Sequence, residues 1–175
     1  MRTFHNSWYV IYTRPNKERK IFSALTEMGI ESLLPMQKSI RSWSDRKKCI
    51  EVPLFPSYVF VCLKDLQEYY HSLTIDGVLY YLRDGKDMAK VRNSTVTDIR
   101  IASSGSNEIE VSSSYFEVGR KIIVSRGALT GLSGEIVSHG GKEKLLVRVN
   151  LLRRYILLTL SEDDVLVQPA VSSFC

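Results

Sequence analysis

The stretch Tyr58–Leu63 (YVFVCL) is the strongest strand signal in the chain, because β-branched and aromatic residues fill it without a break. Alternation along a strand places its aliphatic side chains on one face and Tyr58, Phe60 and Cys62 on the other. The aliphatic face is the natural core side. The aromatic face is either buried under a helix or exposed as a contact surface, and the residues by themselves favour neither.

Strands and helices alternate on both sides of this stretch. Trp8–Tyr12 (WYVIY) is a second aromatic strand, and apolar residues at helical spacing predict an amphipathic helix over 15–28. The segments 33–43 and 47–54 flank a polar, basic tip and predict a hairpin. Further expected elements are a helix over 66–73, a strand over 78–83 and a short helix that opens with the capping pattern Thr95-x-x-Asp98. Residues 1–105 are therefore expected to form an α+β sandwich, a sheet flanked by helices.

The second half of the chain has a different composition. Residues 106–115 are rich in serine and predict a flexible linker. Beyond them, short β-branched segments separated by glycines predict a small β-barrel over 116–175. The expected strands of this barrel are 121–125, 134–138, 145–150, 154–160 and 165–168.

The charge is distributed unevenly along the chain. The 175 residues carry 24 Lys and Arg against 19 Asp and Glu, a formal net charge of +5. All of this excess lies in residues 1–105, which hold 16 basic and 11 acidic residues. A basic front half and a neutral back half predict two modules, of which the first meets a polyanion.

The sequence carries no motif for catalysis or metal binding. Its three cysteines and three histidines stand at none of the spacings of zinc sites, and it has no phosphate-binding glycine loop or nucleophile motif. The longest uncharged apolar run, 52–63, falls well short of the ~20 residues that cross a bilayer. No signal-peptide pattern is visible at the N-terminus. We therefore expect a non-enzymatic, cytoplasmic protein without a cofactor, a metal or a membrane partner.

Two motifs together resemble a known family. The segments Trp8–Tyr12 (WYVIY), 34–36 (LPM) and 53–61 (PLFPSYVFV), with a basic helix after the first, resemble the N-terminal domain of NusG-type transcription elongation factors. The segment 124–137 (VSRGALTGLSGEIV) is similar to the KOW motif, a small β-barrel element of the same proteins. Both motifs occur in the family order, with a linker between them.

The resemblance implies a protein that binds RNA polymerase. In the family, an exposed hydrophobic patch docks on the clamp helices of the largest polymerase subunit, and the domain bridges the DNA channel and suppresses pausing. Carried over by position, the polymerase-binding patch consists of Tyr12, Phe55, Tyr58 and Phe60. Aromatic anchors commonly dominate interface energy. The resemblance therefore favours exposure of the aromatic face of 58–63.

The resemblance also implies a contact with DNA. In the family, the basic start of the first helix lies near the upstream fork and the non-template strand. Arg14 stands at a family position that contacts DNA, and we extend the expected DNA-binding surface to Lys17 and Lys20. Non-template DNA is thus an expected partner.

The barrel departs from the housekeeping members of the family. Leu152, Arg153 and Arg154 replace the Phe-Gly-Arg loop that meets Rho or a ribosomal protein. We expect these residues to bind the KOW partner, a ribosomal protein or another factor, and the change argues against Rho. The sequence of residues 54–58 (LFPSY) looks more like that of the specialised RfaH and UpxY groups, which act on long operons such as polysaccharide loci. The resemblance implies an antitermination factor of this kind, and the β-branched residues of the barrel favour strands over a switch to a helical hairpin.

A second class of function stays open. A free-standing RNA-binding or ribosome-associated KOW protein would use its basic face for RNA and bury the aromatic patch in its core. Truncation of Tyr58 and Phe60 separates the two hypotheses. Removal of interface residues leaves stability nearly intact, whereas removal of core residues costs several kcal/mol.

Overall fold

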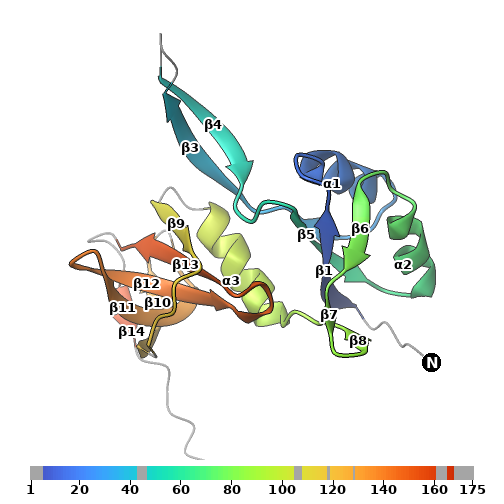
Figure 1. Cartoon of the computed structure of the whole chain (residues 1–175). Coiled ribbons are helices and arrows are strands. Elements are labelled where there is room, and N and C mark those ends of the chain that lie inside the picture. Colours follow the sequence, from blue (N-terminus) through green and yellow to red (C-terminus); the bar gives the residue numbers. More distant parts are fainter. Residues whose placement is uncertain are drawn as a thin grey trace, which may run out of the picture. The chain divides into compact units, whose positions relative to one another are not determined.

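The structure is a computed structural model that describes residues 6–42, 47–104, 108–117, 119–127, 129–160 and 165–167 (Figure 1). The chain divides into two compact units between Val96 and Thr97. This division falls inside helix α3 (Asn93–Ser104), earlier than the boundary at residue 105 that the composition suggests.

Unit 1 is built on a four-stranded antiparallel sheet with the strand order β2-β5-β1-β6. Its strands are β1 (Ser7–Thr13), β2 (Ser32–Leu33), β5 (Tyr58–Leu63) and β6 (Val78–Tyr81). The ladder between β1 and β5 runs from the pair Ser7 and Leu63 to the pair Tyr12 and Tyr58. The two aromatic stretches of the sequence are therefore the neighbouring central strands of one sheet.

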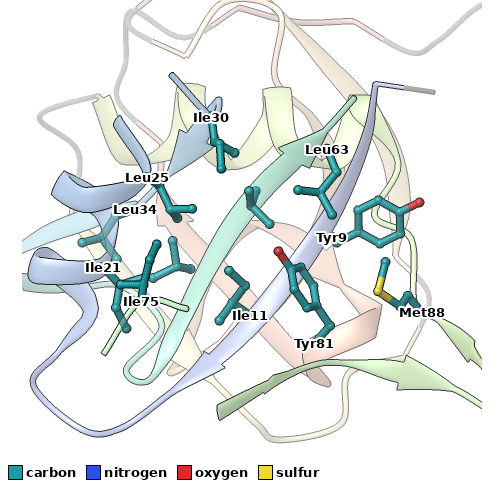
Figure 2. Packing of buried hydrophobic residues seen from close by; sticks show 12 residues of the cluster. Tyr9, Ile11, Ile21, Leu25, Ile30, Leu34, Leu63, Ile75, Tyr81 and Met88 are labelled. Atoms are coloured by element: carbon teal, nitrogen blue, oxygen red, sulfur yellow. The ribbon is translucent and has the colours of Figure 1, made fainter. Parts of the chain in front are cut away.

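Helices α1 (Glu18–Glu27) and α2 (Leu66–Leu73) pack on the aliphatic face of this sheet. Ile21 and Leu25 of α1 enter a buried cluster with side chains of the central strands (Figure 2). Leu73 of α2 packs against this cluster. The other buried members of the cluster are Tyr9, Ile11, Ile30, Leu34, Val59, Val61, Leu63, Ile75, Tyr81 and Met88. The aliphatic face of β5 is thus the core side, as its alternation predicts.

The starts of the two helices have different local causes. Helix α1 begins at Glu18, later than the expected Pro15, because Asn16 adopts a φ of 63°, a left-handed conformation that does not continue into a helix. Helix α2 begins at the expected residue. There the Asp65 carboxylate accepts a hydrogen bond of 2.8 Å from the Glu68 N–H, which is an N-cap.

Two hairpins extend unit 1. Strands β3 (Met36–Ser42) and β4 (Lys47–Pro53) form the hairpin that the sequence predicts, and its tip, 43–46, lies outside the described residues. The second hairpin consists of β7 (Arg83–Asp84) and β8 (Asp87–Met88). The sequence predicts one strand through residue 83, whereas the structure ends β6 at Tyr81 and starts this hairpin.

Unit 2 contains a six-stranded antiparallel sheet with the strand order β14-β10-β11-β12-β13-β9. Its elements are β9 (Ile109–Ser112), β10 (Arg120–Arg126), β11 (Ser133–His139), β12 (Lys142–Val149), the 3-10 turn η1 (Asn150–Leu152), β13 (Arg154–Thr159) and β14 (Val165–Val167). The five expected strands are all present. The additional strand β9 lies inside the span expected as a flexible linker and pairs with β13. The edge strands β9 and β14 do not pair with each other within the described ranges, so closure into a barrel stays a prediction.

Residues 97–104 of α3 belong to unit 2. The Asp98 carboxylate accepts hydrogen bonds from the Ser133 N–H at 3.2 Å and from the Ser133 Oγ at 3.1 Å. Burial raises the pKa of Asp98 above its ordinary value. Asp98 therefore ties α3 to the start of β11, rather than capping a helix that opens near Thr95.

Candidate functional site

Three tyrosines from three neighbouring strands form a row on the aromatic face of the unit 1 sheet. Pairing places Tyr12 of β1 opposite Tyr58 of β5 and opposite Tyr80 of β6. The ring centroid of Tyr12 lies 5.3 Å from that of Tyr58 and 5.1 Å from that of Tyr80. Tyr12 and Tyr58 are half-buried, while Tyr80 is 53% exposed. We refer to these three residues as the tyrosine row.

Sequence reasoning overlooks Tyr80. Its strand is expected, and alternation already separates Tyr80 from Tyr81, which lies in the core cluster. Only the pairing of β6 with β1 brings Tyr80 beside Tyr12. A local pattern contains no information on that pairing.

The other two residues of the expected patch, Phe55 and Phe60, are buried. Their ring centroids lie 6.0 Å apart, and their side chains are 2% and 0% exposed. Val10, which pairs with Phe60 across the β1–β5 ladder, is also fully buried. The structure therefore differs from the exposed patch expected, because only Tyr12 and Tyr58 reach the surface. A contact between the two phenylalanines and a partner requires a rearrangement that exposes them.

The turn that carries Phe55 and Tyr58 is fixed to the start of α1. Ser57 adopts a φ of 67°, its N–H donates to Glu18 Oε1 at 2.7 Å, and its carbonyl accepts from the Thr13 N–H at 2.9 Å. Glu18 is only 5% exposed, and such charge-assisted bonds are the stronger ones. Sequence reasoning overlooks Glu18, because an acidic residue in a first helical turn is common.

The three residues expected to contact DNA surround one acid. Asp76 Oδ2 lies 3.0 Å from Lys20 Nζ and 3.7 Å from Lys17 Nζ. The hydrogen bond from Lys20 and the charges of Lys20, Lys17 and Arg14 lower the pKa of Asp76. Arg14 is exposed at the surface. The structure thus brings the predicted basic residues together, around a carboxylate that sequence reasoning does not include.

The residues expected to bind a partner in unit 2 lie at the end of η1 and the start of β13. Leu152 is buried, whereas Arg153 and Arg154 are exposed. Arg153 adopts a φ of 49°, a left-handed conformation that directs the chain from η1 into β13. Arg153 also lines an open cleft of about 380 Å³. The other residues that line the cleft are Ser113, Tyr115, Asn150 and Tyr155.

The described residues contain no group of three or more His, Cys, Asp or Glu side chains that could hold a metal ion. Cys49 and Cys62 are free thiols, the first exposed and the second buried. Within the same ranges, no helix combines the length and the apolar character that crossing a membrane requires.

Comparison with known proteins identifies relatives of the chain. Residues 6–100, more than half of the sequence, match the family model described as "Transcription termination factor nusG". The chain is similar to a solved structure of Thermotoga maritima NusG that concerns the interaction between its domains. The TM-score is 0.49 and the sequence identity is 19%, and the match covers 87% of this chain and 92% of that chain. The MjSpt4:Spt5 complex in conformation A has a TM-score of 0.30 and 11% identity, with 91% of each chain covered.

Proposed function

We propose that this chain, which belongs to the NusG family of transcription factors, is an elongation regulator that binds RNA polymerase and promotes processive transcription and antitermination. The observation that carries the proposal is the tyrosine row, an aromatic surface on the sheet of the unit that the family model covers. We place the protein in the cytoplasm, where its polymerase would be.

The tyrosine row has the properties of a protein-binding anchor. Tyrosine is enriched among the residues that dominate interface energy. The three rings of the row lie against one another across β5, β1 and β6, so little side-chain freedom is lost on binding. The partner that we propose is the clamp-helix region of the largest polymerase subunit, as the family resemblance implies, with Phe55 and Phe60 joining the contact after they become exposed.

A pull-down of purified RNA polymerase by the full chain tests this proposal. The double variant Tyr12→Ala/Tyr58→Ala removes two rings of the row, and we expect it to weaken binding about tenfold or more. Tyr70→Ala is the matched control, because Tyr70 is 59% exposed on α2. Thermal melts of the three proteins show whether the variants fold. Equal binding by the double variant and the control, both folded, contradicts the proposal.

A free-standing RNA-binding or ribosome-associated KOW protein is the second candidate, and the burial of Phe55 and Phe60 favours it. Phe60→Ala is expected to cost about 3–5 kcal/mol in either case, because the ring is fully buried in the free chain. Stability alone therefore no longer separates the hypotheses. The second candidate gains support if the full chain binds RNA and fails to bind polymerase.

We propose that Arg14, Lys17 and Lys20 contact the non-template DNA strand. All three side chains are wholly or partly exposed between the end of β1 and the first turn of α1, and they lie close enough together to act on the same carboxylate. Phosphate contacts of this kind give an affinity that falls steeply with salt.

We assign the NusG N-terminal domain to residues 1–105, a linker to 106–115 and a KOW domain to 116–175. The glycines of the KOW-like segment support the last assignment. A Cβ at Gly134 would lie 2.7 Å from the Leu146 carbonyl oxygen, so only glycine fits there. We propose that Leu152, Arg153 and Arg154 mark the surface for a ribosomal protein or another factor, with the two exposed arginines making the contact.

We further propose that the protein serves one long operon, such as a polysaccharide biosynthesis locus. The segment 54–58, which resembles the specialised members of the family, supports this. Transcription in vitro from templates with and without the leader of a candidate operon tests it. The expected result is a longer transcript only on the template with the leader.

A further inference from the structure

The acid at the centre of the basic cluster is held by the backbone rather than by the lysines. The Arg14 N–H donates to the Gly77 carbonyl at 2.8 Å, and the Val78 N–H donates to the Ile75 carbonyl at 3.1 Å. Ile75 belongs to the core cluster. The turn that carries Asp76 is therefore anchored on both sides of the acid.

Gly77 lets this turn approach helix α1 closely. Its φ is +99°, and a Cβ at this position would lie 3.0 Å from Lys17 Cβ and 3.4 Å from Ile21 Cδ1. A side chain would push the turn away from the helix, because Lys17 Cβ lies next to the backbone and yields little. The close contact places the carboxylate of Asp76 between the two lysines.

The ammonium groups of the two lysines, in contrast, are able to move away from Asp76. The side chains of Lys17 and Lys20 are 41% and 60% exposed, and that of Asp76 is 59% exposed. Exposed ion pairs of this kind contribute little to stability and exchange readily. A phosphate that approaches α1 meets lysines whose ammonium groups are occupied, beside a negative charge that stays in place.

We propose that Asp76 is an intramolecular counter-ion that occupies Lys17 and Lys20 in the free protein and competes with nucleic-acid phosphate for them. This inference rests on the proposed contact between Arg14, Lys17, Lys20 and DNA. Asp76 reduces the net charge of the cluster formed with Arg14, Lys17 and Lys20 from +3 to +2. It therefore lowers the affinity of this surface for nucleic acid in general, and it makes binding depend on the other contacts of the protein.

The substitution Asp76→Asn tests the inference by removing the charge and keeping the shape. Fluorescence anisotropy with a labelled single-stranded oligonucleotide measures the affinity of the full chain at a series of salt concentrations. We expect Asp76→Asn to bind about fivefold more tightly, the effect of one charge at contact distance in water. The slope of log K against log salt should become steeper by about 0.7, because the surface neutralises about one more phosphate charge of the single strand. A structural role alone would leave this slope unchanged.

Two further variants serve as controls. Asp84→Asn makes the same charge change at an exposed position in β7. Lys17→Ala/Lys20→Ala removes the ammonium groups that Asp76 contacts, and in this background Asp76→Asn should change the affinity much less.

The outcomes separate the inference from the proposed function. Tighter binding by Asp76→Asn than by Asp84→Asn, lost in the lysine background, supports the inference. Equal effects of the two asparagine variants overturn it and leave the DNA contact standing, provided that the lysine variant binds more weakly than wild type. Weaker binding by Asp76→Asn also overturns it, since Asp76 would then orient the lysines for DNA. Unchanged binding by the lysine variant overturns the proposed DNA contact, and the inference with it.

Discussion

The Asp76 cluster of unit 1 and the Glu135–Arg148 pair of unit 2 use the same kinds of charged group in different surroundings. The side chains of Asp76 and its two lysines are 41% to 60% exposed, and each lysine contacts the acid through one pair of atoms, Nζ and Oδ2. Glu135 and Arg148 are only 12% and 20% exposed, and two hydrogen bonds join their side chains. Arg148 Nε lies 2.9 Å from one carboxylate oxygen of Glu135 and Nη2 lies 2.9 Å from the other.

The pair in unit 2 also ties several segments together. Glu135 accepts a hydrogen bond of 3.0 Å from the Gly119 N–H. Arg148 donates to the carbonyls of Phe116 and Glu117, and its guanidinium lies 5.3 Å from the centroid of the Tyr155 ring. We infer that burial and the number of hydrogen bonds determine whether an ion pair stabilises the fold or stays available for exchange.

Among the variants that probe these two clusters, the largest loss of stability is expected for Glu135→Gln. The substitution keeps the volume but removes the negative charge and one of the two acceptor oxygens that the buried side of Arg148 contacts, so unit 2 should lose about 1.5–3 kcal/mol. Urea unfolding, followed by a probe in unit 2, measures this loss. A change in stability no larger than that of Asp76→Asn would show that the two clusters contribute equally to the stability of the fold.

Gly77→Ala should have the next largest effect. The positive φ and the contact with Lys17 Cβ both disfavour a side chain, so we expect unit 1 to lose about 1–2 kcal/mol. The same experiment, with a probe in unit 1, measures it. Gly131→Ala, followed by the probe in unit 2, is a control for the φ contribution, since Gly131 has a similar φ of +88° and an added Cβ would meet Ile101 Cδ1 only at 3.7 Å, an ordinary contact. Equal losses in both variants would mean that the close approach to α1 contributes nothing.

The stability of unit 2 should depend on pH through two opposed groups. The hydrogen bond from Arg148 lowers the pKa of Glu135, so this residue contributes stability that is present above its unfolded pKa and is lost as pH falls through the folded pKa. Burial raises the pKa of Asp98, so its ionisation costs stability as pH rises through that range. The free energy of unfolding should therefore decrease less between neutral and acidic pH for Glu135→Gln than for wild type. Asp98→Asn should be slightly more stable than wild type at neutral pH. A steeper acid loss in Glu135→Gln would contradict the assignment.

The smallest effect on stability is expected for Asp76→Asn. Its carboxylate is exposed and its lysine partners are solvated, so thermal unfolding should coincide with that of wild type within error. Differential scanning fluorimetry of the two proteins is sufficient. A clear decrease in Tm would place Asp76 among the groups that hold the fold, and would remove the contrast with Glu135.

Local pattern was enough to find most elements of the fold. Strand β5 and helix α2 begin and end at the residues predicted, because an unbroken β-branched run and a helical segment behind an Asp cap are signals within a few neighbouring residues. The same reasoning missed β9, whose two apolar residues Ile109 and Val111 stand among serines and charges. That strand forms because it pairs with β13, and such a pairing between distant segments cannot be read from neighbouring residues.

The candidate surfaces divide in the same way. The sequence by itself determined which side chains share a face, such as Tyr58 with Phe60, and which basic residues follow one another on α1. Only the tertiary structure decided that Phe60 is buried, that Tyr80 completes the tyrosine row and that Asp76 lies among the lysines. Lys20 and Asp76 are 56 residues apart in the chain. The periodicity of a helix or strand specifies the direction of a side chain, whereas its neighbours depend on which distant segments pack against it.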